Sequence, residues 1–201
     1  MRKVVPVDKT SYREVAHVTA LAFTNDPLIT TLLAGLPPEV RTKRTINFFI
    51  PYYRTCCRRG LPLQVVADEQ VVGGTCLWPS ENLPLPMPLM VGVVLECYLR
   101  SYFQFTGLLD FLKWSSFIEK KHPKTSHYYV DFFGVDPSRQ NQRLGSAILD
   151  YVTHKADLKN IGCYLESTNA RNLALYQRFG FQIVSKEDII VPTWFLWRDP
   201  V

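Results

Sequence analysis

The sequence lacks the features that mark membrane proteins, zinc proteins and disulfide-linked secreted proteins. The longest apolar stretch, residues 87–99, contains Glu96 and is shorter than the roughly 20 residues that a membrane-spanning helix needs. The five cysteines include no Cys-x-x-Cys pair, and no histidine spacing completes a zinc site. The N-terminal stretch is too charged for a signal peptide. We therefore expect reduced thiols, no metal, no membrane association and a cytoplasmic location.

The chain also lacks internal repeats, low-complexity tracts and linkers that would divide it. Its 201 residues suffice for one well-buried domain, and 47% hydrophobic with 20% charged residues is the balance of a globular protein. The net charge of +5 comes from small, dispersed basic clusters, which are typical of a solvated surface and also suit a polyanionic cofactor. We expect a single domain over residues 1–201 that binds no nucleic acid.

Hydrophobic periodicity predicts a mixed succession of strands and helices. The expected strands are residues 3–7, a hairpin over 61–79 that turns at 68–70, 127–135, 163–167, 181–184 and 193–197. The expected helices are 11–23, a short one within 24–38, 38–59, 88–104, 107–121, 144–159 and 170–181. We expect Ser11 or Thr10 to cap the first helix and Gly180 to close the last. The run 127–135 alternates little, which predicts a strand buried on both faces.

The most informative stretch is residues 134–148, GVDPSRQNQRLGSAI, which joins this buried strand to a helix. The first turn of a helix presents unpaired backbone N–H groups and the positive end of the helix dipole, and such an end binds phosphate. Polar and basic side chains at 139–143 add donors, and Gly145 removes a side chain near the first helical turn. An ordinary polar turn, with a glycine for packing, explains this stretch equally well.

A second segment, LESTNARNLALYQRFGF at 165–181, favours a site. Asn169, Asn172 and Tyr176 are spaced i, i+3 and i+7, which places them on one face of a helix. Each has an ordinary alternative, since Asn169 is a good helix cap and Tyr176 a plausible packing residue. Two amides and a phenol on one stripe, directly after a strand, point to a binding site.

At these residues the sequence resembles the GNAT superfamily of acyl-CoA-dependent N-acyltransferases. The superfamily pattern of a strand, V-x-P-x-x-Q/R-x-x-G-x-G/A and a helix is matched by GVDPSRQNQRLGSA, and N-x-x-A-x-x-L-Y-x-x-x-G-F by NARNLALYQRFGF. Within the superfamily the chain most resembles puromycin N-acetyltransferase-like members, through AFTNDP, LWPSE, HPKTSHYYVDFFGVDP and a late TW. The resemblance implies an α/β (α+β) GNAT fold, with a mostly antiparallel sheet of six to seven strands, splayed central strands and flanking helices. It also implies acetyl-CoA as co-substrate.

The resemblance assigns cofactor-binding roles along these segments. The strand 128–135 would be bulged and splayed from the strand 163–167, with pantetheine in the gap. The implied cofactor-binding residues are Phe133, Gly134 and Val135 for pantetheine, Gln140, Asn141, Gln142, Arg143, Leu144, Gly145 and Ser146 for the pyrophosphate, and Asn169 and Asn172 for the cofactor arm. Tyr176 would lie near the sulfur and give its proton to the leaving thiolate.

Two residues depart from the motifs. Asn172 replaces a small residue of the general second motif but matches its puromycin N-acetyltransferase-like version. Arg143 replaces the first motif glycine, and its Cβ would crowd the phosphates if that position required a positive φ. We therefore predict that Arg143 begins the helix with negative φ.

The implied chemistry is direct attack of a neutral amine on a thioester. Tyr176, with an ordinary pKa of about 10, suits protonation of sulfur. Glu166 is the first candidate base, through water, although it could instead be a structural carboxylate that caps the next helix. Asp26 is the second candidate and could instead bind the substrate ammonium. Asp131 is expected to be a paired core acid, and surface or packing roles are expected for the four histidines, His17, His122, His127 and His154.

The acceptor is expected to be a primary amine of a small molecule. Aromatic residues of the middle segment could line its pocket, although core packing explains them as well: Trp78, Tyr98, Tyr102 and Trp114. An acetyltransferase for protein N-termini or lysines, which would need an open groove, and a non-catalytic acyl-CoA sensor are the alternatives. A monomer and a homodimer are both compatible with the sequence.

Overall fold

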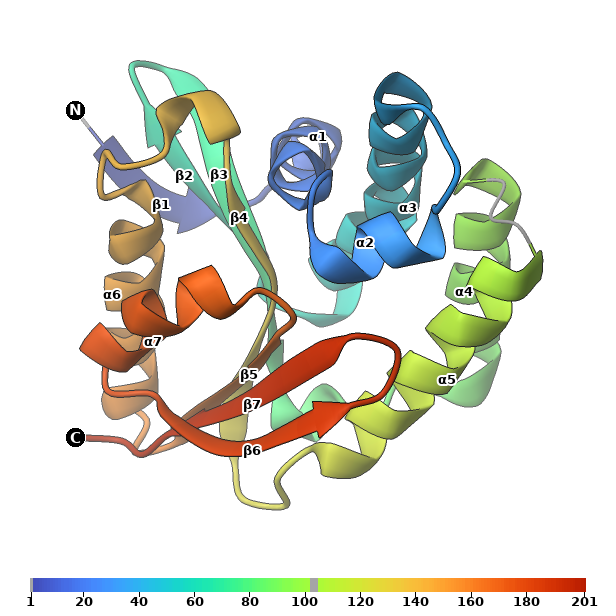
Figure 1. The fold of residues 1–201 in the computed structure, drawn as a ribbon. Helices are drawn as coiled ribbons and strands as arrows, with labels where there is room; N and C mark the ends of the chain where they lie inside the picture. The colour runs from blue at the N-terminus through green and yellow to red at the C-terminus, as the bar shows by residue number, and fades with distance from the viewer. Residues whose placement is uncertain (1, 102–104) are drawn as a thin grey trace.

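The computed structural model describes residues 2–101 and 105–201. Its seven-stranded sheet has the order β1-β2-β3-β4-β5-β7-β6, and each neighbouring pair is antiparallel except β4 and β5, which are parallel (Figure 1). The strands are β1 (Arg2–Pro6), β2 (Leu63–Ala67), β3 (Gln70–Pro79), β4 (His127–Val135), β5 (Gly162–Ser167), β6 (Gln182–Asp188) and β7 (Pro192–Arg198). This mixed α/β architecture confirms the expected fold class.

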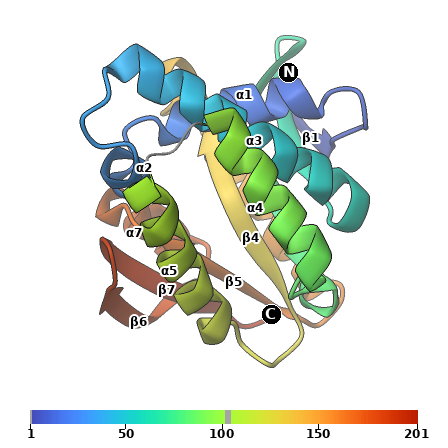
Figure 2. The same ribbon diagram turned by 90° about the vertical axis from the view of Figure 1, so that its right-hand side faces the viewer.

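Helices cover both faces of the sheet. The helices are α1 (Tyr12–Phe23), α2 (Pro27–Leu32), α3 (Pro38–Arg59), α4 (Met87–Ser101), α5 (Phe105–Lys121), α6 (Leu144–Asp157) and α7 (Leu173–Arg178). One layer holds α6 and α7, and the other holds α1 to α5 (Figure 1). Figure 2 views the second layer from outside, with β4 visible between α4 and α5. In the described part of the chain, no helix is both long and apolar enough to cross a bilayer.

The local signals of the sequence place most of these elements, with two corrections. Ser11 stands at the N-cap of α1 without a capping side-chain bond, and Asp8 instead accepts from the N–H groups of Thr10 and Ser11 at 2.6 and 2.8 Å. The expected helix 170–181 is a 3-10 turn, Ala170–Asn172, followed by the shorter α7. As expected, Gly180 closes that segment with φ +84°. The last residues of the expected helix 88–104 lie outside the described residues.

The two central strands separate partway along their length. Only His127–Tyr129 of β4 pairs with Gly162–Tyr164 of β5, so the remaining halves of the two strands diverge. On its other side β4 carries a bulge, because its register with β3 shifts between Gly74 and Cys76 and Phe132 has a φ of +46°. The bulged, splayed central strand that the resemblance implied is confirmed.

Successive side chains of β4 point to opposite faces of the sheet and so belong to two different cores. Tyr129 packs with the helices of the α1–α5 layer, whereas Tyr128 and Val130 pack with α6. Apolar side chains of the amphipathic α6 fill the second core, among them Ile148 and Val152. The divergent halves of β4 and β5 therefore lie between the two layers of the protein.

Candidate active site

The loop before α6 has a backbone conformation that differs from the sequence-based expectation. Arg143, the N-cap residue of α6, has φ +57° and ψ +23°, in the left-handed region. The prediction of a negative φ at this residue is wrong. Asn141, two residues earlier, is also left-handed, with φ +64°. The position therefore has the conformation for which glycine is favoured, and arginine occupies it at a steric cost of roughly 1–2 kcal/mol.

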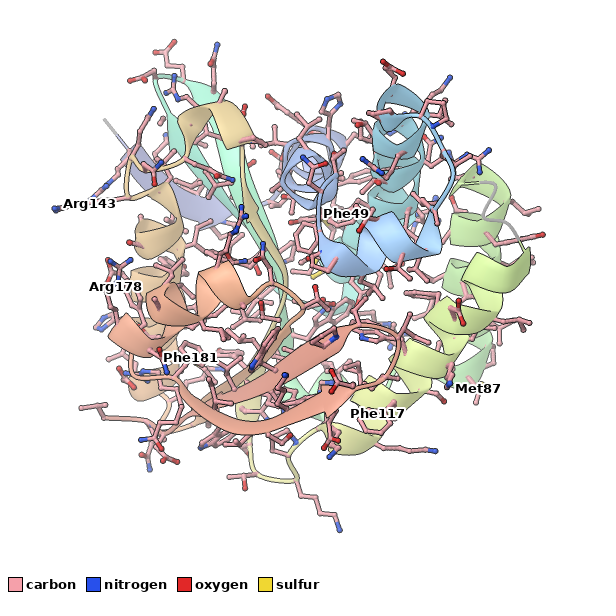
Figure 3. The ribbon with its side chains drawn as sticks, viewed as in Figure 1. Phe49, Met87, Phe117, Arg143, Arg178 and Phe181 are labelled. Carbon is pink, nitrogen blue, oxygen red and sulfur yellow. The ribbon has the colours of Figure 1, made fainter. Side chains whose placement is uncertain are left out.

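The backbone N–H groups of the loop before α6 are free to bind a ligand. Within the described chain, the backbone N–H groups of residues 140–146 have no hydrogen-bond partner. A left-handed residue beside a helical one groups successive N–H donors into a concavity that binds anions. Arg2 donates from Nη1 to the carbonyl oxygens of Gln142 and Arg143, at 3.3 Å each, which holds these acceptors away from that concavity. The side chain of Arg143 points outward from the protein (Figure 3).

Gly145 allows α6 to pack closely on β4. A Cβ at this position would lie 3.1 Å from Cζ of Phe133 and 3.8 Å from Cδ2 of Leu175. The ring of Phe133 in turn lies 6.0 Å from the ring of Tyr176, between centroids. This packing brings the loop, the bulged strand and α7 together, so the two sequence motifs meet in space.

Tyr176 lies at the meeting point and is only 5% exposed. Burial raises the pKa of its hydroxyl well above the usual value, and the carboxyl groups of Asp26 and Glu166 raise it further. Hydrogen bonding with the side chains of Asn172 and Ser167 acts in the opposite direction and lowers this pKa. The hydroxyl therefore keeps its proton at neutral pH, which is the state that a proton donor requires.

The two asparagines of the stripe have different surroundings. Asn169 caps the 3-10 turn, because its side chain accepts a hydrogen bond from the N–H of Arg171 at 3.1 Å. Asn172 lies one helical turn before Tyr176 and interacts with its hydroxyl. The structure thus brings Asn172 and Tyr176 together, while the Asn169 side chain has the capping role that the sequence left open.

Glu166 extends from β5 toward the opposite layer from Tyr176. Its Oε1 accepts a hydrogen bond from the hydroxyl of Tyr129, and its buried Oε2 has no partner among the described residues. Burial raises the pKa of Glu166 to about 8, and the neighbouring Asp131 contributes to that rise. The side chain of Asn169 caps the helical turn that follows β5, so Glu166 does not cap it.

Asp26 has a structural role at the start of α2. Its Oδ1 accepts from the N–H groups of Leu28 and Ile29, at 2.9 and 3.4 Å, and its Oδ2 accepts from the hydroxyl of Thr168 at 2.8 Å. Burial raises the pKa of Asp26, and the bond from Thr168 opposes that rise. Asp26 therefore joins α2 to the segment that follows β5, in the neighbourhood of Tyr176.

A cavity of about 320 Å³ lies on the other side of the gap, between α3, α4, α5 and β4. Its floor contains Asp131, whose Oδ2 accepts a hydrogen bond from the hydroxyl of Tyr52. Asp131 is paired, as expected, but it also lines the cavity, which the sequence analysis did not predict. The only local signal was an acidic residue within an otherwise apolar strand, and such a residue does not reveal which cavity it faces.

The aromatic candidates are divided between the core and the cavity. Trp114 lines the cavity, whereas Trp78 is fully buried in the core and Tyr98 is a partly buried packing residue. Tyr102 lies outside the described residues. His122 and His127 also line the cavity. Burial lowers the pKa of both, that of His122 to about 4 with a further contribution from His127, so both are neutral at neutral pH.

The sheet order, the single parallel pair that diverges and the N–H-lined loop beside it define the N-acyltransferase class of fold. The profile of the acetyltransferase (GNAT) family matches residues 32–181, and the chain belongs to this family. The match makes acetyl-CoA-dependent N-acetyl transfer the activity to be expected of the chain. The likeness to puromycin N-acetyltransferase-like members stays a prediction.

The chain is similar to individual proteins in part of its sequence or in its fold. A mycothiol acetyltransferase from Acidimicrobium ferrooxidans is 42% identical over 84 residues, which cover 39% of this chain and only 25% of that protein. A crystal structure of histone acetyltransferase HPA2 and related acetyltransferase from Corynebacterium glutamicum has a TM-score of 0.68 at 21% identity, and the match covers 100% and 97% of the two chains. The Drosophila melanogaster polyamine N-acetyltransferase has a TM-score of 0.62 at 15% identity, over 99% and 100%.

Acetyl-CoA is the co-substrate of the family, and the residues present fit it. The N–H groups of residues 140–146 suit a pyrophosphate, and the divergent halves of β4 and β5 do not pair with each other, so an extended arm could pair with their backbone. Among the described residues there is no group of histidine, cysteine and acidic side chains that could hold a metal ion.

Proposed function

We propose that this protein transfers an acetyl group from acetyl-CoA to a primary amine of a small molecule. The observation that carries the proposal is the position of the gap between β4 and β5. The divergent halves of the two strands lie between Tyr176 and the N–H-lined loop in one layer and the acid-lined cavity in the other. A thioester that enters from the loop side would thus face an amine that occupies the cavity.

The cofactor-binding residues of the proposal follow the chain through this gap. Phe133, Gly134 and Val135 would hold pantetheine through the backbone, and Asn172, with Asn169 in a lesser role, would contact the arm. The N–H groups from Gln140 to Ser146 would hold the pyrophosphate, and the left-handed conformation of Arg143 supports this role because it groups these donors. The acetyl thioester supplies the activated acyl group.

The proposed mechanism uses a base and an acid on opposite sides of the acyl carbon. Above its raised pKa of about 8, Glu166 is ionised and accepts a proton from the amine nitrogen, through water, and its unpartnered Oε2 suits that role. The nitrogen forms a bond to the carbonyl carbon, and N–H groups of the splayed β4 stabilise the oxyanion. The carbon–sulfur bond then breaks, and Tyr176 gives its proton to the thiolate. Asp26 is the second candidate for the base or for an ammonium contact.

The partly enclosed, apolar shape of the acceptor site favours a small molecule over a peptide. The cavity is bounded by α3, α4 and α5 and by the loop that includes Leu83 and Leu85, whereas a protein acceptor needs an open groove. The Drosophila melanogaster relative is described as a polyamine N-acetyltransferase, which is consistent with a small amine. The cytoplasmic location, the single domain over 1–201 and a monomeric or homodimeric state stay predictions.

The decisive experiment is Tyr176→Phe, assayed by thiol release with a library of amines. We expect kcat to fall about 100-fold, which is the usual contribution of a positioned general acid. The increase in thermal stability caused by acetyl-CoA should remain, because the substitution removes only the hydroxyl. The matched control is Tyr151→Phe, a partly buried tyrosine on α6 away from the gap, which should leave kcat unchanged.

Three outcomes would contradict parts of this proposal. Unchanged turnover in Tyr176→Phe would show that another group protonates the thiolate. Acetylation of peptides but of no small amine would favour the protein acetyltransferase. Binding of acetyl-CoA without acetylation of any amine or peptide would favour a non-catalytic acyl-CoA sensor.

A further inference from the structure

The cavity beside β4 has apolar and aromatic walls. The rings of Phe48 and Phe111 meet edge to face at 5.2 Å between centroids, and Phe48 meets Phe132 at 6.0 Å. Trp114 and Ile118 of α5 complete one side. A volume of about 320 Å³ is at the lower end of the range for ligand pockets, roughly 300–1,000 Å³. The space therefore suits a body of about the size of one aromatic ring with a short chain.

The charged groups that line the cavity are all acidic. Asp131 is 8% exposed and lies at the floor, and Glu119 is an exposed residue of α5 at the rim. The described lining contains no lysine or arginine. Arg54 of α3 forms an ion pair with Glu96 of α4. A cationic ligand is thus favoured and an anionic one is opposed.

Asp131 also lies next to the reactive gap. Tyr129 and Asp131 stand on the same face of β4, and both line the cavity. The hydroxyl of Tyr129 donates to Glu166, while that of Tyr52 donates to Asp131. Two carboxyl groups, each held by a tyrosine, therefore lie between the cavity and the divergent strands. An amine nitrogen at Asp131 is consequently close to the proposed base.

We infer that the acceptor is a monoamine with one compact apolar or aromatic body, whose nitrogen is held at Asp131 and whose body fills the cavity under α4 and α5. This inference rests on the proposed function and specifies its substrate class. Asp131 is then the residue that selects the amine, and Phe48, Phe111 and Trp114 are those that select its body.

The inference excludes two classes of amine. A polyamine or a guanidinoamine whose second cation does not reach Glu119 at the rim would place that charge against apolar walls, where an unpaired charge is strongly unfavourable. An amino acid would place a carboxylate near Asp131 without a cationic partner in the described lining. The fold's relatives include a polyamine N-acetyltransferase, so this selectivity would distinguish the present chain from that enzyme.

The first test compares four amines with the full chain and acetyl-CoA: 2-phenylethylamine, phenylalanine, agmatine and spermidine. We expect kcat/KM for 2-phenylethylamine to exceed that for each of the others about 100-fold, as expected when a buried charged or polar group is left unpaired. Comparable or better turnover of spermidine, agmatine or phenylalanine would overturn the inference and leave the proposed acetyltransferase standing. If no amine is acetylated, the proposed function and this inference both fail.

The second test is Asp131→Asn, which retains an oxygen to accept the hydrogen bond from Tyr52. We expect kcat/KM for 2-phenylethylamine to fall about 30-fold, mainly through KM, with the thermal stabilisation by acetyl-CoA unchanged. The matched control is Glu119→Gln at the exposed rim, for which we expect a change of less than about 3-fold. A native KM in Asp131→Asn would overturn the role of Asp131. The four-amine comparison on the unsubstituted chain tests the substrate class independently of this variant.

Discussion

At the scale of single residues, Arg143 shows how a motif departure is accommodated. The site retains the left-handed backbone that the motif glycine allows, and Arg2 holds the adjoining carbonyl groups. A residue with a Cβ pays a steric cost there, whereas glycine costs more conformational entropy when the chain folds. The arginine side chain points outward, so its bulk does not enter the N–H-lined concavity.

Arg143→Gly should therefore stabilise the protein. Glycine removes the strain of the left-handed backbone, but it also adds entropy to the unfolded chain. The difference between these two effects predicts an increase of about 0.5–1 kcal/mol in the free energy of unfolding. Urea-induced unfolding measures it. Arg143→Ala is the control, because alanine keeps the Cβ and should give no increase. Equal stabilities of the two variants would show that the backbone at this position carries no strain.

At the scale of elements, the bulged strand β4 is in close contact with α1. A Cβ added to Gly134 would lie 2.9 Å from Cβ of Ala22, 3.1 Å from Cγ2 of Thr19 and 3.2 Å from the Thr19 carbonyl oxygen. The helix thus rests directly on the strand segment that also contains Phe133 and Val135. The position of α1 is coupled to the shape of the proposed pantetheine-binding edge.

Gly134→Ala should disturb both stability and cofactor binding. Overpacking against α1 predicts a loss of about 1–3 kcal/mol in the free energy of unfolding, together with weaker acetyl-CoA binding in calorimetry. The control is Gly92→Ala in α4, where an added Cβ meets nothing within 4 Å. That variant should gain about 0.5–1 kcal/mol, because alanine is the better helix former. A neutral Gly134→Ala would mean that α1 is free to shift away.

At the scale of the whole molecule, the buried carboxyl groups make global stability depend on pH. Burial raises the pKa of Glu166 to about 8 and that of Asp131 to about 7. A carboxyl group with a raised folded pKa contributes stability that is fully present below its unfolded pKa and is lost as pH rises through the folded pKa. His122, whose pKa is lowered to about 4, acts in the opposite sense, but only below its unfolded value of 6.5.

The free energy of unfolding should therefore fall between pH 6.5 and 8. In this window the folded Glu166 keeps a proton that the unfolded chain has released, which corresponds to a slope on the order of 1.4 kcal/mol per pH unit for one proton. Glu166→Gln should reduce this slope in urea unfolding at a series of pH values. Glu39→Gln, an exposed residue at the start of α3, should leave it unchanged. The same slope in both variants would contradict a protonated Glu166.

The sequence by itself determined the succession of strands and helices, the loop before α6 and the pairing of Asn172 with Tyr176. These features depend on periodicity, turn residues and spacing along one short segment. Even the splayed strands followed from a resemblance carried by local motifs. Such signals lie within a few residues of the feature that they predict.

Only the tertiary structure decided the left-handed backbone conformation of Arg143, the cap of α1 and the position of Asp131. The left-handed turn at Arg143 is held by Arg2, which lies at the far end of the chain sequence. Asp131 faces the cavity with Tyr52, and Glu166 is held by Tyr129, because α3, β4 and β5 pack together. Contacts between distant segments leave no periodic trace in the sequence, so the acceptor cavity and its acid pair emerge only when the chain is folded.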